Sequence, residues 1–403
     1  MRREKIITLI TSAVFILVSA INHFVLNPKD YSEKVLKVGF VYDGDESIPY
    51  TNNFIRSQYT LKEYFKDKIE IVAKSNVPPD RLENALDDLV AEECSIIFTT
   101  SYSHAIITKE YAEKHPKIHF CQACGDNVNE EPVLKNYHTF MGEIYQGRYA
   151  AGVVAGLKLQ EMINDNKITE EEAKLGYVGA YPFASVISGF TAFLLGARSI
   201  VPTASLTVIY TYTWSSFSEE KACTEHLIDE GCVIISQHTD TIAPAIACEE
   251  AYGKNVFHIG YNQSMVDIAP TTSLTGIRIN WSPYIIGAVS AILENKSIEK
   301  VVKGHTHGND IGAGFDYGWV QMLELNSPVA EGTEKVLNRV VQGFKKGKIS
   351  VFKGNYLGVN VDDDEDIYDL KKEFKDCASS SAPTFRYILK DVITIDEMSL
   401  FDN

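Results

Sequence analysis

The chain has 403 residues, of which 45% are hydrophobic and 23% are charged, and its formal net charge is −16. This composition is ordinary for a folded protein with a sizeable core, and the length allows roughly two or three domains. The negative charge and the lack of a basic stripe argue against a protein that binds nucleic acid.

The N-terminus differs from the rest of the chain. Arg2, Arg3 and Lys5 precede an apolar run over residues 6–21, and the small residues at 18–20 would suit cleavage by a signal peptidase. This pattern is typical of a secretory signal peptide, although the run is close to the shortest length that spans a bilayer as a helix. We expect an exported protein whose leader is cleaved or is kept as a membrane anchor, with a buried helix as a third alternative.

From residue 37 onwards, short β-branched segments alternate with longer segments of helical periodicity. Strands are predicted over residues 37–44, 69–77, 95–101 and 117–123. Helices are predicted between them, over residues 52–66, 79–94 and 107–115. Such alternation predicts parallel strands connected by helices, as in a doubly wound α/β sheet.

The same order of elements then repeats. A long predicted helix is followed by strands over residues 173–180, 205–212, 232–238 and 256–262. We therefore predict an α/β fold of two doubly wound parallel-sheet lobes joined by a hinge. The expected parts are a leader at 1–30, a first lobe of 36–141 plus about 279–305, a second lobe of 142–278 plus about 306–376, and a C-terminal segment at 377–403.

The long predicted helix carries a GxxxG pattern formed by Gly152 and Gly156. In membranes such a pattern mediates helix pairing, but Arg148 and Lys158 flank an apolar stretch that is too short to span a bilayer. We expect these glycines to allow close packing of the helix against a sheet.

Seven cysteines are scattered through the chain without the spacing of a disulfide framework. Cys121 and Cys124 form a CxxC pattern, which could indicate redox chemistry or half a zinc site, but no second ligand pair accompanies it. The polar loop around His305 could hold a metal, and the acidic run at 362–366 resembles a calcium loop that lacks its glycine and glutamate. We expect buried reduced thiols, solvated loops and no metal or other cofactor.

Residues that follow the predicted strands are candidates for a binding site, because ligands bind at the carboxyl ends of the strands in an open parallel sheet. The first lobe contributes mainly hydroxyl, amide and carboxyl groups at these positions. The second lobe contributes mainly aromatic rings and amides. The candidate ligand-binding residues are Asp43, Tyr50, Thr51, Asn52, Thr100, Ser101, Tyr102, Gln122, Tyr181, Phe183, Trp214, His238, Asn262 and Arg278.

Neutral hydrogen-bonding side chains and aromatic rings dominate this set. Amides and hydroxyls suit the polar edge of a heterocycle or a sugar, and aromatic rings stack on flat ligands. His238 near Asp240 would permit acid–base chemistry, but no serine lies in a GxSxG setting and no glycine-rich phosphate motif is present. The residues predict capture of a planar or sugar-like ligand without catalysis.

Several segments together resemble the basic membrane protein family of extracytoplasmic solute-binding proteins, which includes purine nucleoside receptors of ABC importers. The resemblance covers about Lys37 to Ile395 and rests on the segments 37–44, 140–157, 174–186, 231–238, 256–264 and 271–280. It implies the type I periplasmic-binding-protein fold, in which two lobes joined by three crossings hold a ligand between them.

The matching of site residues to this family is partial. The family often has an aspartate after the last strand of the second lobe, where this chain has Asn262, and a lysine where this chain has Arg278. Asp43, Tyr50 and Asn52 or Asn53 are the nearest matches to the family's first-loop residues. An amide removes the charge that would hold ribose hydroxyls. This difference argues against a nucleoside and leaves a free base or another small solute open.

The function implied by the resemblance is capture of a small planar ligand, a purine base or nucleoside, by hinge closure and its delivery to an ABC permease in the membrane. The protein would be extracytoplasmic and associated with the cell membrane, with no nucleic-acid partner and no enzymatic activity. One alternative is a ligand-sensing module coupled to a membrane signalling partner, which an uncleaved anchor would favour. Another is a nucleoside hydrolase, which would need a convergent set of carboxylates or a metal, and the candidate carboxylates are Asp43, Asp45 and Asp240.

Overall fold

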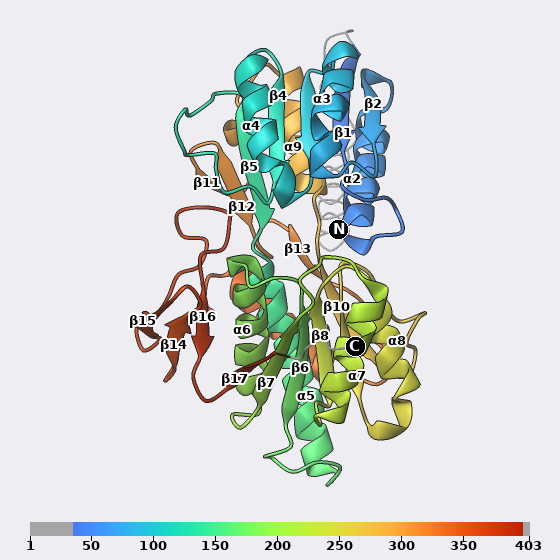
Figure 1. Ribbon diagram of the computed structural model, residues 1–403, viewed down its shortest axis with the longest axis vertical. Coiled ribbons are helices and arrows are strands. Elements are labelled where there is room, and N and C mark those ends of the chain that lie inside the picture. Colours follow the sequence, from blue (N-terminus) through green and yellow to red (C-terminus); the bar gives the residue numbers. More distant parts are fainter. Residues whose placement is uncertain (1–34, 398–403) are drawn as a thin grey trace, which may run out of the picture.

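The computed structural model describes residues 35–397, so the predicted leader at 1–30 lies outside the described residues. Two lobes are stacked along the long axis of the molecule, and each is built on a seven-stranded, mostly parallel sheet with helices on both faces (Figure 1). A small three-stranded sheet lies beside the second lobe. The predicted α/β fold of two parallel-sheet lobes is confirmed.

The sheet of the first lobe has the strand order β11-β12-β5-β4-β3-β1-β2, and within it only β11 runs antiparallel to its neighbour. Its strands are β1 (Leu36–Val41), β2 (Ile69–Lys74), β3 (Ile96–Thr99), β4 (His119–Ala123), β5 (Tyr137–Gly142), β11 (His305–His307) and β12 (Asp310–Ala313). Helices α2 (Pro49–Phe65), α9 (Ser282–Leu293) and α10 (Ile298–Val301) pack together, whereas α3 (Leu82–Ala91) and α4 (Ala105–Lys114) share a separate core.

The sheet of the second lobe has the order β13-β10-β9-β8-β6-β7-β17. Its strands are β6 (Lys174–Gly179), β7 (Ser205–Tyr210), β8 (Ile234–His238), β9 (Phe257–Tyr261), β10 (Ser273–Ile279), β13 (Val320–Met322) and β17 (Ile393–Asp396). Helices α5 (Ile144–Asn164), α6 (Ala184–Arg198) and α11 (Thr333–Lys345) belong to the large core, and α7 (Phe217–Asp229) packs with α8 (Ala243–Glu250).

The small sheet and the short helical turns complete the described chain. The sheet consists of β14 (Leu357–Asn360), β15 (Asp363–Asp369) and β16 (Tyr387–Leu389). The short 3₁₀ turns are η1 (Lys66–Lys68), η2 (Pro79–Arg81), η3 (Tyr102–His104) and η4 (Tyr252–Lys254). Within residues 35–397, no helix combines the length and apolarity that a bilayer crossing requires.

The chain passes between the lobes from β5 to α5, from β10 to α9 and from β12 to β13. Two of the lobe boundaries expected from the sequence differ from those in the structure. Residues 306–313, which the sequence assigned to the second lobe, extend the first sheet because β12 pairs with β5 in parallel register. Within the expected C-terminal segment, β17 joins the second sheet because it pairs in parallel with β7.

The GxxxG glycines of α5 face another helix rather than a sheet, so the expected packing partner was wrong. A Cβ atom placed on Gly152 would lie 1.9 Å from the carbonyl oxygen of Phe193 in α6. A Cβ atom on Gly196 of α6 would lie 2.1 Å from the carbonyl oxygen of Tyr149 in α5. The backbones of α5 and α6 therefore touch, which only residues without a side chain permit.

His305 joins two of the crossings between the lobes. Its Nδ1 donates to Oε1 of Glu143 at 2.5 Å and its Nε2 donates to Oδ2 of Asp316 at 3.0 Å. Glu143 lies between β5 and α5, and Asp316 lies between β12 and β13. Hydrogen bonds to these two carboxylates raise the pKa of His305 to about 10, and the bond to Asp316 makes the larger contribution.

We expect replacement of His305 by glutamine to lower the melting temperature at pH 6, because the imidazolium that links the two carboxylates is lost. A pKa raised from 6.5 to about 10 means that this stabilisation is complete below about pH 6.5 and is lost as the pH rises through 10. Scanning fluorimetry from pH 6 to pH 10.5 should show a difference between wild type and H305Q that shrinks towards zero. A difference that stays constant with pH would contradict this role.

Candidate functional site

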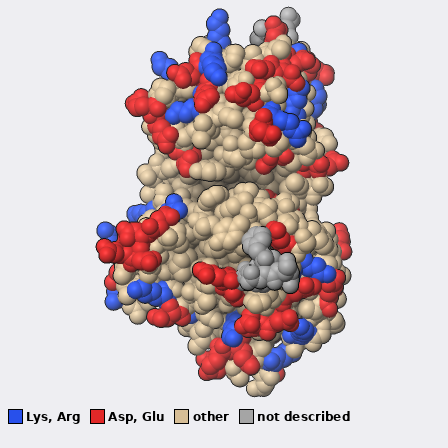
Figure 2. Space-filling view, viewed as in Figure 1, with Lys and Arg blue, Asp and Glu red and all other residues tan. Residues whose placement is uncertain are grey.

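A cavity of about 490 Å³ lies between the two lobes and is walled by residues from both. Figure 2 shows that charged side chains gather on the outer parts of the lobes, whereas the hollowed waist between them is mostly uncharged on that face. The volume falls within the range of about 300–1,000 Å³ that is typical of small-molecule sites. The cavity lies at the carboxyl ends of the parallel strands of both sheets, where the sequence placed its candidates.

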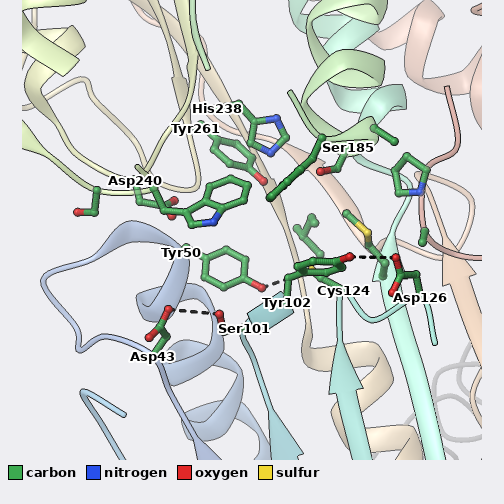
Figure 3. Close-up of a pocket in the computed structure, with 18 of the residues that line it drawn as sticks. Asp43, Tyr50, Ser101, Tyr102, Cys124, Asp126, Ser185, His238, Asp240 and Tyr261 are labelled. Atoms are coloured by element: carbon green, nitrogen blue, oxygen red, sulfur yellow. Dashed lines mark hydrogen bonds between the residues drawn. The ribbon is translucent and has the colours of Figure 1, made fainter. Parts of the chain in front are cut away.

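The first-lobe wall carries carboxyl and hydroxyl groups that are hydrogen-bonded to one another (Figure 3). Ser101, which follows β3, donates its hydroxyl to Oδ2 of Asp43 at 3.2 Å, and Asp43 follows β1. Tyr102 donates its hydroxyl to Oδ2 of Asp126 at 3.1 Å. These bonds occupy one carboxylate oxygen of each aspartate and leave the remaining acceptor capacity for a ligand.

Tyr50 is fixed in this wall by its position in the first turn of α2. Its ring meets Phe54 and Trp281 edge to face, at centroid distances of 5.3 and 6.3 Å. Its hydroxyl donates to the carbonyl oxygen of Thr100 at 2.6 Å. Since the hydroxyl is already bound, Tyr50 offers the cavity its ring rather than a hydrogen bond.

Cys124 of the CxxC pattern also lines the cavity, beside Tyr50. Its Sγ lies 3.4 Å from the hydroxyl oxygen of Tyr50, and burial raises the pKa of the thiol to about 11. All seven cysteines are free, and no group of three His, Cys, Asp or Glu side chains in residues 35–397 is placed to hold a metal ion. Cys124 is therefore a neutral thiol in the wall and not a redox centre.

The second-lobe wall is a continuous group of aromatic rings. Phe183, before α6, lies 6.1 Å from Trp214, whose ring lies 6.2 Å from His238. His238 in turn meets Tyr261 at 4.9 Å in an edge-to-face arrangement. The guanidinium of Arg148 in α5 lies 4.0 Å over the ring of Tyr261, a cation–π contact that fixes this end of the wall.

His238 is an uncharged member of this wall. Burial, with a smaller contribution from the positive charge of Arg148, lowers the pKa of His238 well below its ordinary value. The guanidinium of Arg148 is fully buried and donates to the carbonyl oxygen of Gln237 at 2.7 Å. A neutral imidazole among aromatic rings adds a flat, uncharged surface to this wall.

Asp240 supplies the carboxyl group of the second-lobe wall. Its loop is anchored by Glu220 of α7, whose Oε2 accepts the hydroxyls of Thr239 at 2.8 Å and Thr241 at 2.7 Å. Asn262 donates its amide to Oδ1 of Asp240 at 3.2 Å. Burial, reinforced by the negative charge of Glu220, raises the pKa of Asp240 to about 8, so this carboxyl is mostly uncharged at neutral pH.

Part of the predicted set lies in the cavity wall and part lies behind it. The predicted residues in the wall are Asp43, Tyr50, Thr51, Ser101, Tyr102, Phe183, Trp214 and His238. The predicted residues outside the wall are Asn52, Thr100, Gln122, Tyr181, Asn262 and Arg278.

The residues outside the wall mostly support those in it. Gln122 donates to the carbonyl oxygen of Ser101 at 2.8 Å, and the ring of Tyr181 stacks on Phe183 at 5.1 Å. Arg278 donates its Nε to Gln321 of β13 at 3.0 Å, away from the cavity. Asn262 accepts the amide of Asn53 at 3.1 Å, so it links α2 of the first lobe to Asp240 of the second.

Several cavity residues were missed in the sequence. Asp126 lies three residues after the end of β4, and Ser185 lies six residues after the end of β6, so each lies farther along the chain than the candidates predicted at that strand. Tyr261 is the last residue of β9. The C-terminal segment contributes a further part of the wall that no strand-end rule would find. Its members are Ala382, Pro383, Thr384 and Arg386.

The chain is similar to several known binding proteins. The model of one protein family, described as ABC transporter substrate-binding protein PnrA-like, matches residues 37–354. A purine-binding protein of Brucella abortus (strain 2308) is 28% identical over 342 residues, which cover 84% of this chain and 89% of that protein. A putative ABC transporter glucose-binding protein of Haloferax volcanii is 27% identical over 281 residues, which cover 68% of this chain and 64% of that protein.

A solved structure shows the same fold. It is an ABC transporter solute-binding protein from Conexibacter woesei, with a TM-score of 0.60 and 16% sequence identity. The match covers 78% of this chain and 98% of that one. At this identity the likeness concerns the two-lobed fold alone.

Proposed function

Because the chain belongs to the PnrA-like family of ABC-transporter substrate-binding proteins, we propose that it captures a purine base or nucleoside between its two lobes. The members of this family bind solutes for import and are not enzymes. The proposed ligand is held outside the cytoplasm and is then released to an ABC permease in the membrane.

The observation that carries the proposed ligand class is the pairing of aromatic rings from both lobes across one cavity. Tyr50 and Tyr102 come from the first lobe, and Phe183 and Trp214 come from the second. A flat ring between such walls gains roughly 0.5–1.5 kcal/mol per stacked pair beyond the burial of its area. The Brucella relative is named as purine-binding, whereas the Haloferax relative is named as glucose-binding. The aromatic rings on both walls support the planar ligand of this proposal.

Capture requires the lobes to move apart and close again. On one side of the cavity Asn53 and Asn262 are hydrogen-bonded across the gap, and on the other the rings of Tyr102 and Phe183 approach to 5.9 Å. A ligand enclosed behind both contacts can enter only when they open. The crossings near Glu143, Asn280 and Asp316 are the segments where a hinge would bend.

The candidate carboxyl groups of a nucleoside hydrolase are only partly brought together. Asp45 accepts hydrogen bonds from Ser47 and from Asn76, at 2.6 and 3.1 Å, and is not part of the cavity wall. Asp43 and Asp240 line the cavity together with Asp126. Because the members of the family bind solutes and are not enzymes, we favour binding without bond cleavage.

A thermal-shift screen with purine bases, nucleosides and glucose tests this function. A purine at 100 times its dissociation constant should stabilise the protein by about 2.7 kcal/mol. Trp214→Ala should weaken purine binding by at least about tenfold, because it removes one stacking wall. Phe217→Ala, at an exposed ring in α7 outside the cavity wall, should leave binding unchanged.

The outcomes separate the alternatives. A shift with glucose but with no purine would contradict the proposed ligand class while leaving the family intact. A purine shift that survives Trp214→Ala would place the ligand outside this cavity.

A further inference from the structure

The segment from Asp376 to Arg386, here called the C-terminal strap, connects the two lobes without being one of the hinge crossings. Figure 1 shows this red part of the chain rising from the small sheet to the level of β12 in the first lobe. It lies beyond the part of the chain that the family model matches, which ends at residue 354. The match to the family model therefore does not cover the strap, although the strap forms part of the cavity wall.

The strap is bound to the second lobe at its start and to the first lobe at its middle. Asp376 accepts the hydroxyl of Ser188 in α6 of the second lobe at 2.6 Å. Asp310 in β12 of the first lobe accepts the hydroxyls of Ser380 at 3.1 Å and Ser381 at 2.6 Å, and also the backbone N–H of Ser381. These contacts hold the strap as a wall across one side of the cavity.

Arg386 gives this wall a distinct chemistry. Among the described residues that line the cavity it is the one Arg or Lys, and the same cavity wall carries the carboxyl groups of Asp43, Asp126 and Asp240. Its Nη2 is held 2.8 Å from Oδ2 of Asp362 in the small sheet. Its Nε is buried and has no hydrogen-bond partner among the described residues.

We propose that Arg386 selects a ligand with an acceptor edge, which among purines means a 6-oxopurine rather than a 6-aminopurine. This inference rests on the proposed function and narrows its substrate class. A guanidinium donates two parallel hydrogen bonds to the O6 and N7 atoms of a 6-oxopurine. A 6-aminopurine keeps the N7 acceptor but has an N–H donor in place of O6, so one of the two donors of Arg386 would be left unpaired.

The carboxyl groups of the cavity complement this assignment. A 6-oxopurine carries an N–H group at position 1, next to its carbonyl, and this group needs an acceptor. Asp43, Asp126 and Asp240 provide acceptors in the same cavity. One ring can therefore satisfy the guanidinium with its acceptor edge and a carboxyl group with its donor edge.

Isothermal titration with hypoxanthine and adenine tests the assignment. The wild type should bind hypoxanthine at least about tenfold more tightly than adenine, since a bidentate pair discriminates by about 1–3 kcal/mol. Arg386→Gln should weaken hypoxanthine binding by at least about tenfold and change adenine binding by less than about threefold, which removes the preference. Arg339→Gln, at an exposed arginine of α11, is the matched control and should change neither affinity.

Each other result has a defined meaning. Equal affinities of the wild type for the two bases, or equal losses in R386Q, would overturn the role of Arg386 while leaving purine binding in place. If the wild type bound neither base and no purine nucleoside, the proposed function would fail, and this inference with it. An unchanged melting temperature of ligand-free R386Q would show that any loss of affinity is not a loss of folding.

Discussion

Replacing Gly152 with alanine is expected to destabilise the protein by at least about 3 kcal/mol, at the upper end of the cost of overpacking a core. The added Cβ atom would lie 1.9 Å from the carbonyl oxygen of Phe193 and 2.8 Å from its carbonyl carbon. These are backbone atoms of α6, so no side-chain rotation can relieve the overlap. The two helices must separate, and the apolar contacts between them would be lost along their length.

Urea unfolding of wild type and G152A measures this effect. Gly253→Ala is the matched control, because a Cβ atom at Gly253 has nothing within 4 Å. The control should change the free energy of unfolding by less than about 1 kcal/mol. A similarly small change in G152A would show that α5 and α6 do not make backbone contact.

Replacing Asp240 with asparagine is expected to stabilise the ligand-free protein at pH 8 but not at pH 4. The pKa of this carboxyl is raised from 3.8 to about 8, mainly by burial. Between these values the unfolded chain binds fewer protons than the folded one, so the free energy of unfolding of the wild type falls as the pH rises. The gain in D240N at pH 8 should be on the order of 2–5 kcal/mol, since one pKa unit corresponds to about 1.4 kcal/mol.

Thermal or urea unfolding at both pH values tests this expectation. The amide of the variant can still accept the hydrogen bond from Asn262, so the loop should keep its shape. Asp267→Asn, at an exposed aspartate of the same lobe, should change the stability at neither pH. Destabilisation by D240N at pH 8 would mean that the carboxylate is charged and well solvated in the folded protein.

We expect such a carboxyl group to serve the binding site. Its burial lowers the stability of the ligand-free protein at physiological pH, and no salt bridge within residues 35–397 compensates it. A ligand that bonds to Asp240 would recover this free energy on binding. Residues of this kind are where binding function and stability are expected to conflict.

The overall fold could be predicted because strands and helices alternate with clear turn residues between them. The family could also be predicted, and the match over residues 37–354 confirms it. The edges of the sheets could not be predicted, because they depend on pairing between distant segments. Residues 393–396 pair with β7, and residues 310–313 pair with β5, across long stretches of chain.

The sequence could predict which strand ends border the cavity, but not which side chain at each strand end faces it. Thr100 and Ser101 are neighbours, yet Thr100 donates its hydroxyl inward to the carbonyl oxygen of Val41 whereas Ser101 faces the cavity. Successive residues of an extended chain point to opposite sides. If the predicted end of a strand is wrong by one residue, the side chain expected in the cavity and the side chain expected behind it change places.

Asn262 illustrates the same limit in another way. The sequence placed it against the ligand, but its left-handed backbone conformation, with φ of 66°, directs its amide to Asp240 and to Asn53. Asparagine is one of the few residues that adopt this conformation readily. The carboxyl group of the second-lobe wall therefore follows β8, as Asp240, and not β9.

A crystal structure of the protein with hypoxanthine tests the central claim most directly, namely that two lobes clamp a planar ligand in the cavity between them. We predict density for the ring against Trp214 and Tyr50, with its O6 and N7 edge towards Arg386 and with both lobes closed around it. Density for the base on an outer surface of either lobe, or a closed cavity without the base at saturating concentration, would contradict the account.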